Sequence, residues 1–198
     1  MSKLSRKFKV PDPLAHLYDF ANTLDVRRFT HHGVPHRQDD ELTEPAGLAA
    51  WLAGQGLLVP GAGKITPAMF DAALRLRAGV RDYLGCDPVE RRKNGRVAGR
   101  LNDALSGFPL VADARGGEAL TLRPSREDAL AGLSVVVAEL YNGSINGTLD
   151  RLKMCAAEEC RRVFFDRSKP ATRRWCMSTL CGNRIKTRTY RARRAGAA

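Results

Sequence analysis

Two cysteine pairs with the same spacing lie near the end of this chain of 198 residues. Cys155 and Cys160 are five positions apart, Cys176 and Cys181 are also five apart, and fifteen residues separate the pairs. Zinc is held by four soft ligands in a tetrahedron, and two short-spaced pairs supply such a set from two segments of chain. Because four thiolates leave no open coordination position, we predict one structural Zn²⁺ and not a catalytic metal.

Two other interpretations of the cysteines are weaker. A redox pair usually has the C-x-x-C spacing, which differs from the spacing found here. Four unrelated buried thiols would not be expected to repeat one spacing twice. The chain shows no secretory signal pattern and no apolar run near the roughly 18 residues of a membrane helix. We therefore expect a cytoplasmic protein that has no membrane partner and whose thiols stay reduced.

Positive charge is concentrated in the last quarter of the sequence. Residues 151–198 contain 14 lysines and arginines against three acidic residues, whereas residues 1–150 contain 19 basic and 18 acidic ones. The whole chain carries a net charge of +12. Such asymmetry indicates a polyanionic partner, and nucleic acid is the commonest one.

The first 150 residues are predicted to be mostly helical. Helix starts are indicated by a polar cap, often followed by proline, at Asp12-Pro13, Thr43, Thr66-Pro67, Asp87-Pro88 and Ser125. Asn94-Gly95 offers a break within the fourth helix. Residues 30–41 read as a loop, residues 109–123 as a β-hairpin, and "NGSING" (142–147) as a linker.

The fold class predicted is therefore α+β with two domains. Residues 1–145 form a mostly helical domain with a β-hairpin, and residues 151–198 form a small treble-clef-like zinc finger. Within the finger, "RVFFDRS" (162–168) reads as a short strand, and a basic helix follows the second cysteine pair.

The segment from Phe164 to Arg194 closely resembles the CGNR-type zinc finger, named for the signature that stands here at Cys181 to Arg184. The upstream "LYDFANTLDVR" (17–27), the middle helices and the hairpin at 109–123 resemble the ABATE domain that precedes this finger in bacterial proteins. The resemblance implies the two-domain architecture, the zinc site and membership of a family described as stress-induced transcriptional regulators.

Three functions remain open from the residues. The first is a DNA-binding transcriptional regulator whose N-terminal domain senses a small-molecule ligand or mediates assembly into a homo-oligomer. The second is an RNA-binding or ribosome-associated zinc module, and the third is a protein-interaction adaptor with an acidic partner. An enzyme is not expected, since no nucleophile–base pairing, open metal site or glycine-rich cofactor loop is evident. Arginine suits phosphates and guanine edges; the predicted nucleic-acid contacts are Arg173, Arg174, Arg184, Lys186, Arg188, Arg191, Arg193 and Arg194.

Two of the conspicuous side chains have alternative roles. Arg184 either reads a base or braces the finger against the first domain. Trp175, which directly precedes a cysteine ligand, is predicted to pack against Phe164 or Phe165, with base stacking as the alternative.

Overall fold

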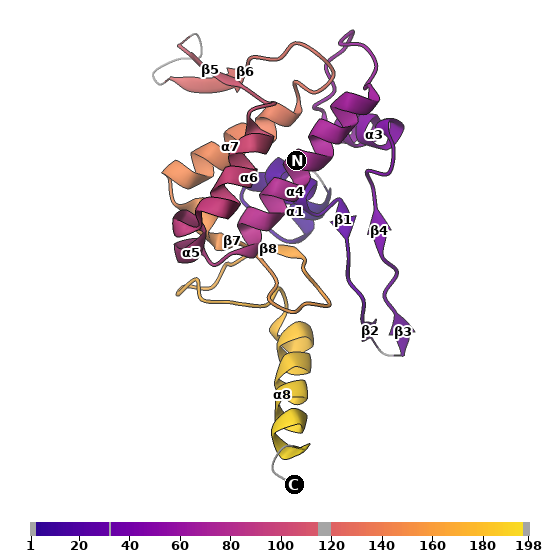
Figure 1. Ribbon diagram of the computed structural model, residues 1–198, viewed down its shortest axis with the longest axis vertical. Helices are drawn as coiled ribbons and strands as arrows, with labels where there is room; N and C mark the ends of the chain where they lie inside the picture. Colours follow the sequence, from indigo (N-terminus) through magenta and orange to yellow (C-terminus); the bar gives the residue numbers. More distant parts are fainter. Residues whose placement is uncertain (1–2, 32, 115–119, 196–198) are drawn as a thin grey trace.

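Helix α4 (Pro67–Gly85) lies at the centre of a helical body in the computed structural model, which describes residues 3–31, 33–114 and 120–195 (Figure 1). The helix begins where the sequence predicts, because the Thr66 hydroxyl accepts a hydrogen bond of 3.3 Å from the Met69 amide and Pro67 occupies the first turn. One face of α4 is buried, and its apolar members are Phe70, Ala73, Leu76, Val80 and Leu84.

Two further helices follow from the next start signal. The Asp87 carboxylate caps α5 (Pro88–Lys93) by accepting from the Val89 amide at 3.0 Å. The predicted break at Asn94 is present, and the Asn94 side chain caps α6 (Gly95–Leu105) in turn. Helix α6 packs closely on α4, since a Cβ placed on Gly79 would lie 3.3 Å from the Ala104 side chain.

The N-terminal segment and α7 form the opposite side of the body. The segment contains α1 (Lys3–Lys7), a 3₁₀ turn η1 (Asp12–Leu14) and α2 (Ala15–Ala21). Helix α7 (Leu133–Ile145) packs on α2 and η1. Side chains of α2, α4 and α7 together make the main core of the protein.

The two predicted ends of α7 are wrong. It begins at Leu133 and not at Ser125, because the Asp128 carboxylate accepts from the Leu130 amide and pairs with Arg126 in a local turn. It also continues through the first part of the predicted "NGSING" linker. Gly143 permits this, since a Cβ there would meet a methyl group of Leu14 at 2.8 Å, so the helix lies tightly against η1.

An extended arm replaces the loop predicted for residues 30–41. Its strands are paired antiparallel as β1 with β4 and β2 with β3, with bounds Leu24–Asp25, Thr30–His31, Val34–Pro35 and Asp39–Asp40. Figure 1 shows this arm beside the body, reaching toward the level of the finger. The arm leads into α3 (Pro45–Gln55), whose N-cap position is Glu44, one residue after the predicted Thr43, and the Glu44 side chain makes no capping hydrogen bond.

The β-hairpin predicted across residues 109–123 is confirmed. Strand β5 (Leu110–Asp113) pairs antiparallel with β6 (Thr121–Pro124), in a register that places Val111 opposite Arg123. The Arg-Gly-Gly part of the predicted turn lies outside the described residues.

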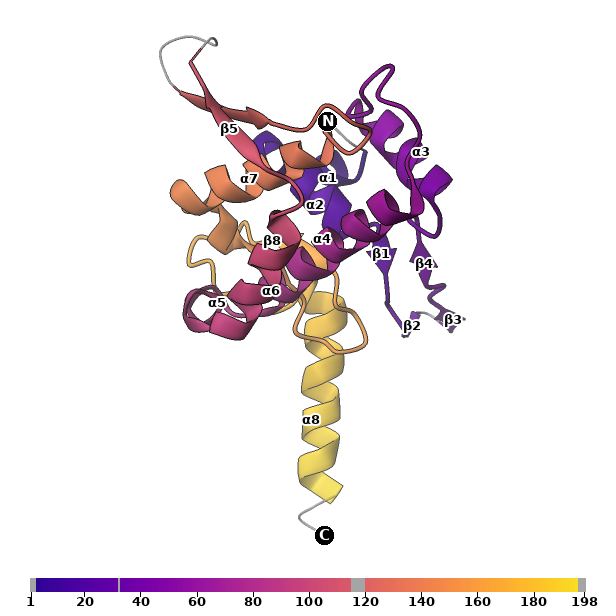
Figure 2. The ribbon, with the colours of Figure 1, turned by 45° about the horizontal axis from the view of Figure 1, so that its top comes forward.

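The last quarter of the chain forms the finger. A 3₁₀ turn η2 (Thr148–Arg151) leads into strands β7 (Leu152–Met154) and β8 (Val163–Phe165), which pair antiparallel. A π-helical turn η3 (Ser178–Gly182) then continues into α8 (Asn183–Ala195). The α+β class with a small finger is confirmed. In Figures 1 and 2, α8 projects alone from the body.

The finger hairpin is part of the main core. Leu152, Met154 and Val163 belong to the same cluster of buried side chains as α2, α4 and α7. The cysteines belong to a second, smaller cluster. The independent folding of residues 1–145 and residues 151–198 therefore stays a prediction. Over the residues described, no helix has the length and apolar character needed to span a membrane.

Candidate metal centre and nucleic-acid interface

The four predicted cysteine ligands meet at one point. The sulfur atoms of Cys155, Cys160, Cys176 and Cys181 all lie within 4.8 Å of one another. The Cys160 and Cys181 sulfurs lie 3.6 and 3.7 Å from that of Cys176. A tetrahedron with Zn–S bonds of about 2.3 Å has edges of roughly 3.8 Å. The four cysteines therefore form a zinc-binding site, as predicted.

The electrostatics of the four sulfurs also fit a metal cation. Hydrogen bonds from Cys160 and Cys176 lower the pKa of the Cys155 thiol. The contact with Cys155 raises the pKa of Cys160 and of Cys176, and burial raises that of Cys181 to about 12. The ionisation of one thiol thus disfavours the ionisation of the next. A divalent cation reverses this effect and allows all four to be deprotonated. Zn²⁺ would supply structural cross-linking here.

Local backbone geometry positions each cysteine pair. The first pair lies between β7 and β8, where the Cys155 amide donates to the Arg162 carbonyl at 2.8 Å and the Cys160 amide to the Ala157 carbonyl at 2.8 Å. In the second pair, Cys176 precedes the π-helical turn and Cys181 lies within it, so Cys181 is at the entrance to α8. Metal coordination at that point would join the start of α8 to the hairpin.

A buried carboxylate holds the loop between the two pairs. Asp166 is fully buried and accepts from the Ser168 amide and hydroxyl, the Arg173 amide and the Lys153 ammonium. Burial alone would raise its pKa, but the hydrogen bonds led by Ser168 outweigh burial and lower it. Asp166 is therefore a charged organising centre for residues 166–173.

Side chains of the body attach the finger by hydrogen bonds to its backbone. The side chain of Asn22, within the "DFANTL" segment, donates to the Val163 carbonyl at 3.1 Å and accepts from the Val163 amide at 3.0 Å. Arg81 of α4 is buried and donates to the Ala21 carbonyl at 2.6 Å and to the Arg161 carbonyl at 3.2 Å. These contacts place the hairpin of the finger against α2 and α4.

Arg184, the arginine of the CGNR signature, bridges the finger and the arm. Its guanidinium pairs with Glu159 at 2.8 Å and lies 4.2 Å from the centre of the Phe29 ring. The Arg28 amide of the arm also donates to the Glu159 carbonyl at 2.9 Å. The Nη1 atom of Arg184 is buried. The contacts of Arg184 fit the bracing role better than base reading.

The other predicted nucleic-acid residues fall into two groups. Arg173 and Arg174 lie in the loop before the second cysteine pair: Arg173 donates to the Cys176 carbonyl and lies over Phe164, and Arg174 lies over Trp175. The remaining ones lie on α8, where Arg188 reaches Glu159 at 3.4 Å. Among the residues described, no carboxylate is paired with the exposed α8 cations Lys186, Arg191, Arg193 and Arg194.

Trp175 packs as predicted. Its half-buried ring joins the small cluster that contains Phe164 and the cysteines, and it lies against Gly182. The ring is thus part of the finger's own core.

Several contact residues were not predicted from the sequence. Asn22, Phe29, Arg81 and Glu159 join the finger to the rest of the molecule. The "DFANTL" segment contained one sequence indication of such contacts. In it, the polar pair Asn-Thr directly follows an apolar helix. Phe29 lies next to a segment predicted to be a loop, and Arg81 is a charged residue within the apolar pattern of α4.

Comparisons with known families agree with this geometry. Residues 15–158 match the ABATE family model, described as "Putative stress-induced transcription regulator". Residues 151–194 match the CGNR zinc finger. The two matches follow the order predicted from the sequence, and both models describe regulatory or zinc-finger modules. No curated protein matches the chain.

Proposed function

Because the chain belongs to the ABATE family of stress-induced transcription regulators, we propose that it is a DNA-binding regulator that contacts duplex DNA through α8. The observation that carries the proposal is the exposure and the positive charge of this helix. None of its thirteen residues is buried, and six of them are basic while none is acidic.

An exposed helix of this length has little stability by itself. Isolated helices shorter than about 12–15 residues are marginal in water, and no α8 side chain is fully buried, although Ile185 packs partly buried against the cysteine cluster. Its positive charges also repel one another. Binding to a polyanion removes this repulsion and orders the helix, so the exposed state favours a nucleic-acid partner.

The zinc site gives α8 a fixed origin. Cys181 lies in the turn that continues into the helix, and Arg184 joins the first helical turn to the arm. A helix of 13 residues is about 20 Å long, and its diameter of about 10–12 Å with side chains suits a major groove about 12 Å wide. Five of its six cations are arginines, whose planar fork matches phosphates and guanine edges.

The N-terminal domain would then sense a ligand or mediate assembly. A cavity lined by residues of both the domain and the finger offers a place for such a ligand.

The test is direct binding of labelled nucleic acids to the zinc-loaded full chain. Duplex DNA should bind with an affinity that falls steeply with salt, and a variant with both Arg191→Gln and Arg194→Gln should bind at least tenfold more weakly. Arg75→Gln, an exposed arginine on the body, is the matched control and should bind like the parent. Preference for a structured RNA hairpin over duplex DNA would favour the RNA-binding function. Failure to bind either polymer at low salt would contradict the proposal.

A further inference from the structure

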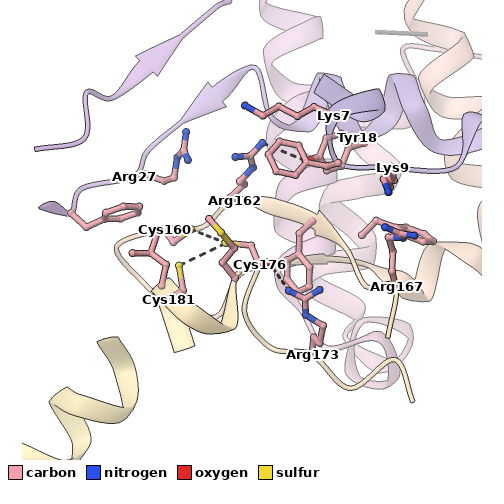
Figure 3. A pocket seen from close by; sticks show the side chains of 16 residues that line it. Lys7, Lys9, Tyr18, Arg27, Cys160, Arg162, Arg167, Arg173, Cys176 and Cys181 are labelled. Carbon is pink, nitrogen blue, oxygen red and sulfur yellow. Dashed lines mark hydrogen bonds between the residues drawn. The ribbon is translucent and has the colours of Figure 1, made fainter. Parts of the chain in front are cut away.

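A cavity of about 300 Å³ opens between the N-terminal segment and the finger (Figure 3). Basic side chains surround it and no acidic side chain lines it. The cations come from both parts of the chain: Lys7, Lys9, Arg27, Arg162, Arg167 and Arg173.

The floor of the cavity is aromatic. Its rings are those of Phe8, Tyr18, Phe29, Phe164 and Phe165. Rings of this kind pack against a flat apolar ligand and stack on its faces. The combination of a ring-lined floor with a basic rim is typical of sites that bind one small molecule in a defined orientation.

Some of the cations already have partners within the protein. Arg27 pairs with Asp25, Arg173 donates to the Cys176 carbonyl, and Arg162 lies over the Phe8 ring at 4.0 Å. Lys7 and Arg162 also line an adjoining cavity that contains Asp25, Asp39 and Glu41. These acidic groups compensate the charges on that side.

Lys9 and Arg167 lack such compensation. Both are exposed, neither lines the adjoining acidic cavity, and across the described residues no carboxylate pairs with either. They lie on the same side of the pocket in the view of Figure 3. Like charges facing one cavity repel, and an anion between them removes that repulsion.

The backbone at Lys9 is also unusual. Lys9 has a φ of +52°, in the left-handed region that favours glycine. The Val10 amide donates to the Ser5 carbonyl at 3.0 Å and the Lys9 amide to the Arg6 carbonyl at 3.1 Å, so Lys9 occupies the position at the end of α1 that is most often glycine. A lysine there costs about 1 kcal/mol relative to glycine. The chain thus tolerates strain where the side chain lines the cavity.

We propose that this cavity binds a small aromatic anion, whose ring lies on the phenylalanine floor and whose carboxylate, sulfonate or phosphate group lies between Lys9 and Arg167. The volume is about twice that of the roughly 150 Å³ cavity that holds benzene, so a ligand larger than a single benzene ring fits. Because Cys176 and Cys181 also line the cavity, a bound ligand contacts both the N-terminal segment and the metal site. A regulatory effect on α8 rests on the proposed function, whereas ligand binding itself does not.

A matched pair of fluorescent probes tests the proposal. 1-Anilinonaphthalene-8-sulfonate carries two ring systems and a sulfonate, and N-phenyl-1-naphthylamine is the same skeleton without the charge. With the zinc-loaded full chain and no nucleic acid, the sulfonate should bind saturably at one site per chain, at least tenfold more tightly than the neutral probe.

Two variants and one control locate the site. Lys9→Gly should weaken sulfonate binding at least fivefold without lowering the melting temperature, because glycine relieves the backbone strain while removing the charge. Arg167→Gln should weaken binding similarly. Lys64→Gln, an exposed lysine outside the cavity, should leave binding unchanged.

Three results would overturn the proposal: equal binding of the two probes, unchanged binding by both cavity variants, or displacement of the probe by a short single-stranded oligonucleotide. The last result would assign the cavity to the nucleic-acid surface. A chain that binds the probe as expected but no duplex DNA would contradict only the proposed function.

Discussion

The guanidinium of Arg184 lies 4.2 Å from the centre of the Phe29 ring and pairs with Glu159 at 2.8 Å. The start of the basic helix is thereby joined to an arm more than 150 positions earlier in the chain. A contact of this kind explains why an arginine follows the second cysteine pair so closely. It orients α8 relative to the body.

Removing this contact should destabilise the protein. Arg184→Ala loses a half-buried ion pair and a cation–π contact, so we expect a loss of about 2 kcal/mol in the free energy of unfolding. Arg193→Ala, at the exposed end of α8, is the control and should change stability by less than about 0.5 kcal/mol. Thermal unfolding of both variants measures the difference. An Arg184→Ala variant as stable as the parent would contradict the bracing role, and weaker DNA binding by that variant would then favour base reading.

Zinc should be present at one equivalent per chain. Elemental analysis of the purified protein measures it, and Cys181→Ser should lose the metal because three thiolates hold zinc less tightly. The α-helical circular dichroism should fall only by the contribution of α8, since the cysteines form a cluster separate from the main core. Cooperative loss of all helical signal on chelation would show instead that the finger and the helical body fold as one unit.

Asn22 should be important for attaching the finger. Its side chain makes both a donor and an acceptor bond to Val163, so Asn22→Ala leaves two backbone groups without partners. We expect a loss of about 2–3 kcal/mol in stability with the zinc content unchanged. Asn146→Ala, at the exposed end of α7, is a matched control that should cost less. Loss of zinc in Asn22→Ala would place its role in the metal site.

The salt dependence of DNA binding should reflect the free cations of α8. Two of its six cations contact Glu159, which leaves Lys186, Arg191, Arg193 and Arg194 available. Four phosphate contacts predict a slope of about −3.6 for log affinity against log salt. Each glutamine substitution among the four should reduce the slope by about one. An affinity independent of salt would contradict phosphate contact by this helix.

Asp19 should make stability depend on pH. Burial raises its pKa to about 6, above the usual value of 3.8. The folded chain therefore binds more protons than the unfolded chain between about pH 4 and pH 6, and the Asp19 contribution to stability falls as pH rises through that window. Asp19→Asn should remove this fall, which urea unfolding at several pH values can measure. A pH profile identical to the parent would show that Asp19 titrates alike in both states.

Local chemistry allowed much of the fold to be predicted. The caps at Thr66 and Asp87 begin helices where expected, and the expected break at Asn94 is present, because a capping side chain and its amide lie within three residues of each other. The four cysteines were identified because ligand identity and spacing are themselves written in the chain. The start of α7 was missed because Asp128 stabilises a turn that competes with the helix.

The sequence by itself thus determined the metal, its ligands, the charge of the last helix and most helix starts, since each depends on residues close together in the chain. Only the tertiary structure decided which arginine braces and which are free. Asn22 and Val163 are 141 positions apart, and Arg184 and Phe29 are farther apart still. Such pairs form only when the arm, α2 and the finger are packed together, because long-range contacts depend on the arrangement of whole elements and leave no periodicity in either segment.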